Sequence, residues 1–271
     1  MTKAAHGTLV STISSTNPSF AWRHEMLHSA PQDRYFWVTR GQARAIVAGA
    51  EVGLSQNSLV SVPAKVPFQL QTSAGTFLNI LATDQLARRV GEPKSQLYRL
   101  SDPSAQRDMA QLFETLRRET QTVEIGQNRA IQANVLLLTV WLLRHDRLLF
   151  SPQRLSAAQR LSRAFLSMLE AGFASDKSPQ HYAAALGVTP THLTRATKEA
   201  LNKPASTLVA DRKYRAAKEA IIDHGTPIKD VAAALGFSSA AYFTRGFQTH
   251  CGQTPSGFKK AQNTVLTPST T

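Results

Sequence analysis

The C-terminal half of the chain contains one short sequence twice. Residues 183–189 read Ala-Ala-Ala-Leu-Gly-Val-Thr, and residues 232–238 read Ala-Ala-Ala-Leu-Gly-Phe-Ser. Each copy is soon followed by a Thr-Arg pair, Thr194-Arg195 and Thr244-Arg245. Small alanines let a second helix cross closely, and glycine can adopt the left-handed conformation that ends a helix. The repeat therefore predicts two helix-turn-helix units.

The residues around each copy fit this interpretation. Ser178-Pro179 and Thr226-Pro227 are expected to begin the first helix of each unit, because Ser and Thr cap helices and proline suits the first position. Thr189 and Ser238 are expected to cap the second helix. Between the units, Pro204–His224 has apolar residues at helical spacing and predicts a rigid connecting helix. Two reading helices held by it can enter successive major grooves about 34 Å apart.

The early residues of the second helix in such a unit face base edges in the DNA major groove. The expected base contacts are therefore Thr191, Thr194 and Arg195 in the first unit and Ala240, Ala241 and Arg245 in the second. Arginine can donate two hydrogen bonds to guanine, worth about 1–3 kcal/mol, whereas alanine offers contact with a thymine methyl. We therefore expect the first unit to read sequence more sharply. Considered alone, either arginine would suit a surface ion pair. Because the two arginines occupy equivalent places in duplicated helices, contact with DNA is favoured for both.

The composition agrees with a nucleic-acid partner. The 271 residues suggest two domains, and 31 Lys+Arg against 18 Asp+Glu give a net charge of +13. Such an excess predicts an anionic partner, either nucleic acid or, less often, a membrane surface. The basic excess is denser in the C-terminal half, so double-stranded DNA is the expected partner. Phosphate contacts are expected from Thr189, Ser238, Ser239 and Lys259.

No feature of the sequence predicts a membrane segment. The longest apolar stretch, Val135–Leu143, is much shorter than the about 20 residues that a spanning helix needs. Residues Met1–Ser15 do not have the pattern of a signal peptide. The expectation is a soluble, cytoplasmic protein without a membrane partner.

The N-terminal part has a different texture, with short apolar runs separated by turn residues. The runs are Leu9–Ile13, Tyr35–Val38, Ala45–Val47, Leu59–Val62 and Phe77–Leu81. Runs of this length and spacing predict the strands of a small sandwich or barrel.

From about residue 104 the pattern becomes helical. Met109, Leu112, Phe113 and Leu116 fall on one helix face. The next segment, Gln127–Arg147, is apolar on nearly all sides and must therefore be covered on more than one side. Either a partner chain or a larger core could cover it, and the sequence favours neither.

These observations predict an α+β protein. Residues 1–100 would form a β-rich domain, 101–150 a helical element, 151–262 a double helix-turn-helix domain, and 263–271 a flexible tail.

The second unit resembles the AraC/XylS family of bacterial transcription regulators in detail. The matching residues are Ile228, Val231-Ala232, Leu235–Ser239, Tyr242–Arg245, Phe247, Gly252–Pro255 and Phe258-Lys259. The resemblance covers roughly residues 154–262. It implies a DNA-binding domain with two helix-turn-helix units joined by a long helix, promoter binding and, usually, activation through contact with RNA polymerase. The chain departs from the family pattern at Thr197, Asn202 and Lys213, where phenylalanine, glycine and arginine are usual.

The N-terminal runs are similar, more loosely, to the cupin-like sensor domain of that family, at Phe36–Gly41 and Leu59–Pro63. By this resemblance residues 1–100 would be a cupin-like sensing domain. The two following helices, within 101–150, would be a helical dimerisation element that makes a homodimer. A small effector could occupy a pocket lined by Trp22, Trp37, Arg40 and Phe68, although these residues would equally well fill the barrel.

A literal zinc-peptidase motif, His-Glu-x-x-His, occurs at residues 24–28. It must lie on a helix for both histidines to bind one zinc ion. The alternation of Phe20, Trp22, His24 and Met26 predicts a strand instead, which would place His24 and His28 about 13 Å apart. Phe68 stands where a cupin enzyme would need another histidine. We therefore expect no enzyme activity, no metal and no cofactor.

Two alternatives stay open for experiment. One is a metal-dependent enzyme, either a zinc peptidase or a cupin enzyme, and the other is a basic protein that binds DNA without sequence preference. Cys251, the one cysteine, has no base beside it in the sequence and is expected to be a structural thiol.

Overall fold

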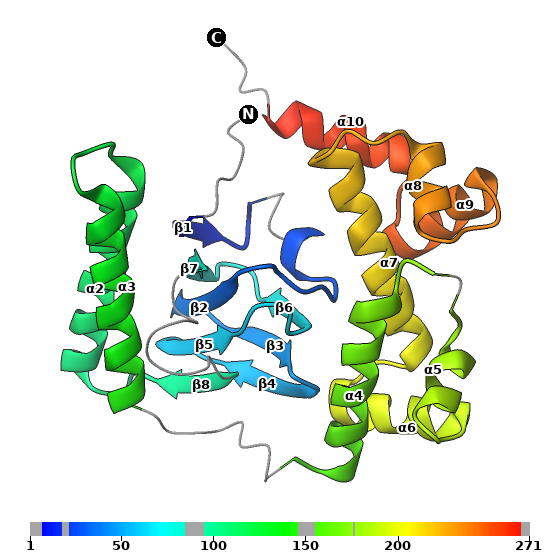
Figure 1. The fold of residues 1–271 in the computed structure, drawn as a ribbon, viewed down its shortest axis with the longest axis horizontal. Coiled ribbons are helices and arrows are strands. Elements are labelled where there is room, and N and C mark those ends of the chain that lie inside the picture. Colours follow the sequence, from blue (N-terminus) through cyan, green and yellow to red (C-terminus); the bar gives the residue numbers. More distant parts are fainter. Residues whose placement is uncertain (1–6, 18–21, 85–94, 146–154, 176, 267–271) are drawn as a thin grey trace.

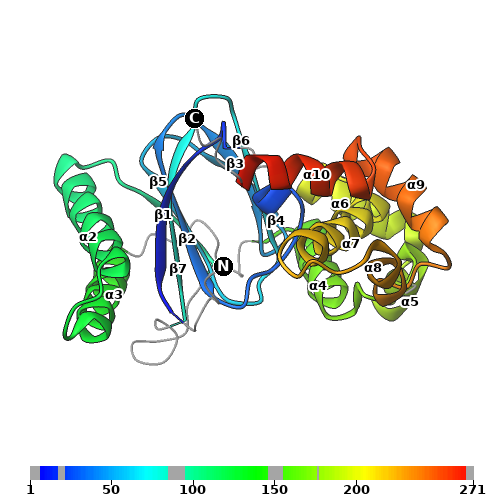
Figure 2. The ribbon, with the colours of Figure 1, turned by 90° about the horizontal axis from the view of Figure 1, so that it is seen from above.

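The structure is a computed structural model that describes residues 7–17, 22–84, 95–145, 155–175 and 177–266. It is an α+β fold in which a β-sandwich lies between a helical pair and a group of C-terminal helices (Figures 1 and 2). No described helix is long and apolar enough to cross a membrane.

The sandwich consists of two antiparallel sheets. The larger has the strand order β1-β7-β2-β5-β8 and the smaller β4-β3-β6. The strands are β1 (Leu9–Ser14), β2 (Asp33–Arg40), β3 (Ala43–Val47), β4 (Ala50–Leu54), β5 (Ser58–Val62), β6 (Phe68–Thr72), β7 (Phe77–Thr83) and β8 (Gln96–Arg99). All five predicted runs are confirmed as strands.

The larger sheet is buried on both faces. Side chains alternate along a strand, so Phe36 and Val38 of β2 enter the core between the sheets, while Tyr35 and Trp37 point the other way. On that outer side Trp37 meets Phe113, with ring centroids 5.4 Å apart. Burial on both faces explains why the strand reads as a continuous apolar run.

The helical pair α2 (Pro103–Gln121) and α3 (Gln127–Arg144) covers this outer face (Figure 2). Asp102 caps α2 by accepting a hydrogen bond from the amide of Ser104 at 3.1 Å. The predicted inward face of α2 is confirmed, since Met109, Phe113 and Leu116 are buried. The predicted end of the second helix at Arg147 lies outside the described residues.

The C-terminal part is all helical. Its helices are α4 (Ala157–Gly172), α5 (Pro179–Ala185), α6 (Pro190–Leu201), α7 (Ala205–Ile222), α8 (Ile228–Ala234), α9 (Ala240–Cys251) and α10 (Pro255–Leu266). They form two cores, one around Phe165, Leu193 and Leu208 and one around Phe243 and Phe247.

Two details differ from the sequence-based expectations. Residues 22–24 are helical and the chain then bends, so the predicted strand is wrong. The ring centroids of His24 and His28 lie 6.2 Å apart, whereas a strand would separate the backbones of the two residues by about 13 Å. The helix α10 continues to Leu266, so the predicted tail begins too early. The expected domain limit at residue 150 lies outside the described residues, and the other limits stay predictions.

Candidate nucleic-acid interface

The two helix-turn-helix units have the same turn. Gly187 (φ 68°) and Gly236 (φ 75°) are both left-handed. The backbone amide of the residue after each glycine donates to the carbonyl of the first alanine of the repeat. These hydrogen bonds run from Val188 to Ala183 and from Phe237 to Ala232, and both are 3.0 Å long. This is the Schellman pattern, which satisfies carbonyl groups at a helix end. Ala183 and Ala232 are buried, as close helix crossing requires.

The second helix of each unit has a side-chain cap. The Thr189 hydroxyl accepts from the amide of His192 at 3.1 Å, as expected. In the second unit Ser239, not Ser238, accepts from the amide of Tyr242 at 3.1 Å. The alignment with Thr189 predicts Ser238 as the capping residue. Because α9 begins one residue later, the amide of Tyr242 is within reach of Ser239 instead.

The starts of the first helices differ in a similar way. Ser178 and Pro179 begin α5 as predicted. In the second unit Pro227, not Thr226, occupies the capping position of α8. The amide of Thr226 donates instead to the carbonyl of Ala220 at 2.9 Å, so Thr226 belongs to the turn that closes α7.

Equivalent residues form the exposed faces of α6 and α9. These faces are made by Thr191, His192, Arg195, Lys198 and Glu199 on α6 and by Ala241, Tyr242, Arg245, Gln248 and Thr249 on α9. We call them the two reading faces. The opposite sides are buried in the cores, for example at Leu193 and Phe243.

The structure places four of the six predicted base-contacting residues on the reading faces: Thr191, Arg195, Ala241 and Arg245. Thr194 and Ala240 are half-buried, and Ala240 packs against the second core. Sequence reasoning missed His192 and Tyr242, the next residues along each face. Tyr242 is 57% exposed, unusually high for a large apolar side chain. Ser239, taken as the capping residue of α9 in place of Ser238, would have indicated from the sequence that Tyr242 lies on this face.

The arginines of the reading faces are not used by the fold. Among the described residues, neither Arg195 nor Arg245 forms an ion pair. The other interpretation of either arginine, a surface ion pair within the fold, therefore does not apply. Their guanidinium groups are available to an anionic partner.

Three of the expected phosphate contacts lie at helix N-termini. Thr189, Ser238 and Ser239 are exposed at the starts of α6 and α9, where free amide groups favour negative charge. Lys259 lies on α10 and is half-buried.

The helix α7 joins the units, as predicted. Asn202 (φ 54°) makes the left-handed turn after α6, where the family pattern has glycine. Along α7, Leu208 lies in the first core and Tyr214 and Ile221 in the second. One helix packed into both cores limits their relative movement.

The units differ at one inward position. Phe247 of α9 is fully buried, and its counterpart Thr197 of α6 is fully buried too, with its hydroxyl donating to the carbonyl of Thr194 at 3.1 Å. Burying a phenylalanine contributes about 1.5–3 kcal/mol, so the first core lacks an aromatic contribution that the second has.

The residues proposed to line an effector pocket do not lie together. Trp22 packs in the second helix-turn-helix core, Trp37 lies under α2, and Phe68 fills the sandwich core. Arg40 is exposed above Phe77, 5.8 Å from its ring centre. The prediction of one pocket from these four residues is therefore wrong, because each aromatic side chain faces a different layer.

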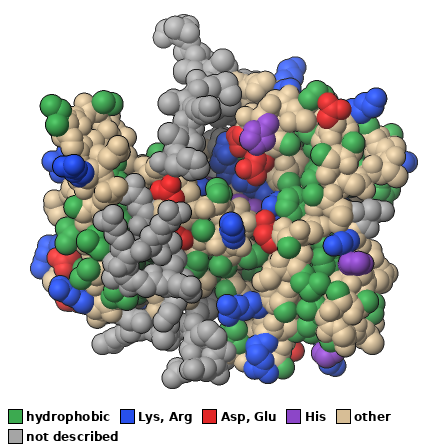
Figure 3. All heavy atoms as spheres, in the orientation of Figure 1, with side chains coloured by type: hydrophobic (Ala, Val, Ile, Leu, Met, Phe, Trp, Pro, Cys, Tyr) green, Lys and Arg blue, Asp and Glu red, His purple; other side chains and the backbone are tan. Residues whose placement is uncertain are grey.

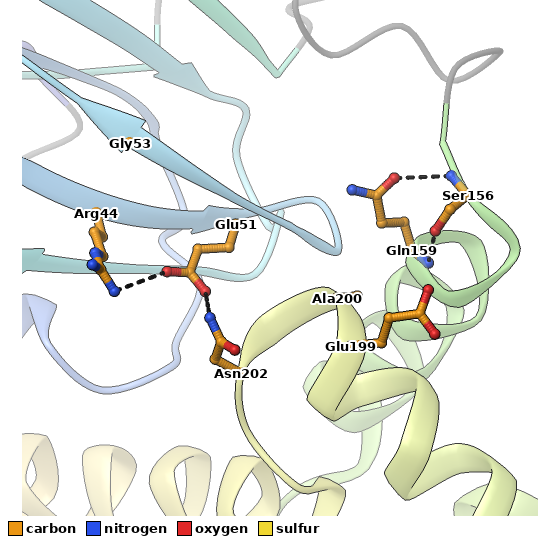
Figure 4. Close-up of a pocket in the computed structure, with 8 residues that line it drawn as sticks. All are labelled: Arg44, Glu51, Gly53, Ser156, Gln159, Glu199, Ala200 and Asn202. Carbon is orange, nitrogen blue, oxygen red and sulfur yellow. Dashed lines mark hydrogen bonds and ion pairs between the residues drawn. The ribbon is translucent and has the colours of Figure 1, made fainter.

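A cleft does lie between the sandwich and the first unit (Figure 4). Its volume is about 440 Å³, and its lining residues are Arg44, Glu51, Gly53, Ser156, Gln159, Glu199, Ala200 and Asn202. Glu51 accepts from Nδ2 of Asn202 at 2.8 Å and lies 3.8 Å from Arg44. The cleft is therefore crossed by a polar contact between the two parts of the molecule.

The His24–His28 motif and Cys251 lie in surroundings that suit structural roles. His28 is buried, and its Nδ1 lies 2.9 Å from the carbonyl oxygen of Met26. Within the described part of the chain, no three His, Cys, Asp or Glu side chains are grouped to hold a metal ion. Burial raises the pKa of the Cys251 thiol, which disfavours the reactive thiolate.

Comparison with known proteins supports the assignment of the C-terminal helices. Residues 182–261 match a family model described as a helix-turn-helix domain. The match runs from Tyr182 in α5 to Ala261 in α10 and so spans both units and α7. No curated protein sequence matches the chain.

Several solved structures are similar. Apo ToxT from Vibrio cholerae is 11% identical, with 93% of this chain and 97% of that chain covered and a TM-score of 0.46. The C-terminal domain of AraT, a response regulator from Geobacillus stearothermophilus, is 25% identical over 40% and 88%, with a TM-score of 0.36. A DNA-binding transcriptional dual regulator from Escherichia coli K-12 is 23% identical over 42% and 99%, with a TM-score of 0.34.

Proposed function

Because residues 182–261 are a helix-turn-helix domain of the AraC/XylS type, we propose that this DNA-binding regulator recognises a two-part promoter site with α6 and α9. The observation that carries the proposal is the equivalence of the two reading faces. Each presents an arginine six residues after the residue that caps its helix, and neither arginine forms an ion pair among the described residues. A helix in this geometry enters a major groove, and α7 gives the two helices a fixed separation.

The roles follow from the chemistry of each position. Arg195 and Arg245 donate to guanine, and Thr191 and Ala241 contact neighbouring bases. Thr189, Ser238, Ser239 and Lys259 hold the phosphate backbone, which fixes orientation without reading sequence. Thr194 and Ala240 support these contacts from the edges of the faces.

Selection of bound sequences from a random duplex pool, at one stated salt concentration, tests the proposal. We expect a site with two subsites about one helical turn apart. Arg245→Ala should weaken binding to that site by roughly tenfold or more and change binding to random DNA little. Arg40→Ala, on the sandwich, is the control.

The same assay separates the competing classes. A protein that binds DNA without preference would yield no enriched sequence, and Arg245→Ala would weaken both kinds of binding equally. Stoichiometric zinc or iron in the purified protein would favour a metal-dependent enzyme.

We further propose that the protein is a homodimer formed through α3. Leu136, Leu137 and Leu143 of this helix are 42%, 57% and 53% exposed, and Val140 is half-buried between them. Hydrophobic side chains lie at the surface over the helical pair, on the left of Figure 3. An exposed apolar stripe of this kind is typical of a protein interface.

The proposed outcome of DNA binding is activation through contact with RNA polymerase, which the family resemblance supports. Transcription in vitro from a promoter carrying the selected site should rise when the protein is added. A fall would identify a repressor.

The proposed place for a small effector is the cleft of Figure 4, whose volume falls in the range of ligand sites. Its polar lining favours a small polar molecule, and an occupant would alter the contact of Glu51 with Asn202. A panel of small carboxylic and amino acids should contain a compound that raises the melting temperature. The same compound should not do so in Glu199→Ala.

A further inference from the structure

The segment Trp22–Ser29, here termed the brace, lies between the sandwich and the C-terminal helices. It carries the His24–His28 motif, and the proposed function makes no use of it. Trp22 and Met26 belong to the hydrophobic core of the second helix-turn-helix unit, whereas Leu27 belongs to that of the first. The brace therefore contacts both units.

Trp22 anchors the brace to the second unit. It is 5% exposed, and its ring meets that of Phe258 on α10 edge to face, with centroids 5.6 Å apart. Its Nε1 donates to Oε1 of Gln262, also on α10, at 3.1 Å. A buried aromatic ring whose polar atom has a partner holds both position and orientation.

Arg23 adds a charged contact where α7 ends. Its guanidinium donates to both carboxylate oxygens of Asp223, at 2.7 and 3.0 Å. Its backbone carbonyl accepts from Nε of Arg215 at 3.1 Å. A bidentate arginine–carboxylate pair fixes an angle as well as a distance. Asp223 is the last residue before the chain turns into the second unit, so the pair holds that junction.

The other end of the brace contacts the first unit. Leu27 is 1% exposed within the first core. The hydroxyl of Ser29 donates to Glu170 of α4 at 2.7 Å. Glu170 also accepts two hydrogen bonds from Arg212 of α7, at 2.6 and 2.7 Å. The brace thus joins a charged network that ties α4 to α7.

The brace itself is fixed to the sandwich. The backbone groups of His28 and Phe68 of β6 exchange two hydrogen bonds, at 3.0 and 2.8 Å. Nε2 of Gln69 donates to the carbonyl of Glu25 at 2.7 Å. A segment held at this end by a sheet strand can resist movement at the other.

Several other contacts of the sandwich lie at the first unit. Gly49 abuts the backbone of Arg163 on α4, Glu51 accepts from Asn202, and Gln69 accepts from Nζ of Lys203 at 3.1 Å. The first unit is therefore held by the sandwich directly, and the brace extends that support to the second unit. The reading faces of α6 and α9 stay exposed with the brace in place.

We propose that the brace is a positioning element for DNA binding. It holds the second unit at a fixed place relative to the first, and so sets which spacing between two DNA subsites the protein accepts. The proposal rests on the proposed reading of DNA by α6 and α9. Trp22 and Arg23 are its positioning residues and contact no base.

The test measures binding of the full chain to three duplexes. They carry the selected site, the same site with base pairs inserted between the subsites, and one subsite with the other scrambled. Two linked modules bind more tightly than one when the geometry lets both engage, so wild type should prefer the selected spacing by about 100-fold.

Arg23→Gln should lose about tenfold in affinity at the selected spacing and discriminate less between spacings, with single-subsite binding unchanged. Combining Arg23→Asp with Asp223→Arg should restore the discrimination. Trp22→Phe keeps the ring but removes the hydrogen bond to Gln262, and it should relax the spacing preference if Arg23→Gln does not fold. Arg40→Gln makes the same change on an exposed arginine of the sandwich and should behave as wild type.

Unchanged spacing dependence in the folded Arg23→Gln and Trp22→Phe variants would overturn the proposal. Tighter binding of these variants at every spacing would also overturn the proposal, because the brace would then oppose DNA binding and would not favour one spacing. A wild-type chain that selects no sequence would instead contradict the proposed function.

Discussion

Arg212, Arg215 and Lys218 of α7 are each less than one-tenth exposed, whereas Arg195 and Arg245 are exposed. The buried cations serve the fold. Arg212 pairs with Glu170, and burial lowers the pKa of Arg215 to about 10. Because the net charge alone does not separate these two groups of cations, the basic composition predicted a nucleic-acid partner but not the face that meets it.

Tyr242 changes the expectation for the second unit. The sequence predicted weak reading there because Ala240 and Ala241 align with the expected contact positions. The structure turns Ala240 toward the core and exposes Tyr242, the counterpart of His192. The second reading face therefore has an aromatic hydroxyl beside Arg245.

Tyr242→Ala is expected to weaken binding to the selected site by about tenfold, as for the loss of one direct contact. Tyr242→Phe separates the hydroxyl from the ring. Electrophoretic mobility shift at fixed salt measures both. Arg40→Ala is the control, because Arg40 is exposed on the sandwich and lies outside both reading faces. Wild-type affinity in Tyr242→Ala would remove this residue from the interface.

At the scale of elements, the C-terminal helices could be predicted because their signals are local. Capping residues, prolines and left-handed glycines act within one turn of the chain. Five of the eight described strands were also predictable, from short runs between turns. The brace was not, because Trp22 and Met26 are buried by α7 and α10, which are far away in sequence. The alternating spacing of these residues in the sequence is typical of a strand, although helices and not a sheet bury them.

The turn of the first unit gives a prediction at this scale. Gly187 has φ 68°, and a Cβ built there meets nothing within 4 Å. The cost of Gly187→Ala would therefore come from backbone conformation alone, about 1–2 kcal/mol. Gly187→Asn should cost less, since asparagine tolerates this conformation. Urea unfolding of both variants measures the difference, and equal losses would contradict the backbone explanation.

At the scale of the whole molecule, the helical pair α2 and α3 lies across the sandwich from the DNA-binding helices (Figure 2), and α3 carries the exposed apolar stripe. The sequence indicated that Gln127–Arg147 needs cover on more than one side and left open what provides it. One side is buried, at Ile131, Val135 and Leu138, in the core that α3 shares with α2 and the sandwich. A partner on the other side would place two DNA-binding domains at the ends of the dimer.

Leu137→Glu combined with Leu143→Glu is expected to convert the dimer to a monomer in sedimentation velocity. Both side chains are more than half exposed, so the free energy of unfolding of a single chain should change little. Gln132→Glu places the same charge on an exposed position of α3 and should leave the dimer intact. A dimer that persists in the double variant would locate the interface elsewhere.

The junction between sandwich and DNA-binding helices should weaken in acid, because His28 lies at its centre. Burial lowers the pKa of His28 well below its usual value, and the positive charges of Arg215, His24 and Arg212 lower it further. In the unfolded chain the same histidine titrates near 6.5. Below that pH the unfolded state binds a proton that the folded state refuses, so the free energy of unfolding falls as the pH falls.

The expected loss is up to about 1.4 kcal/mol for each pH unit between 6.5 and the lowered pKa, with no loss above about pH 7.5. Urea unfolding at pH 7.5 and 5.5 measures it. His28→Asn removes the titrating group and should flatten this dependence, whereas His181→Asn, at an exposed position of α5, should not. Parallel pH profiles for wild type and His28→Asn would show that other groups control the acid response. A loosened brace at pH 5.5 should also relax the spacing preference on DNA, linking the acid response to the positioning of the second unit.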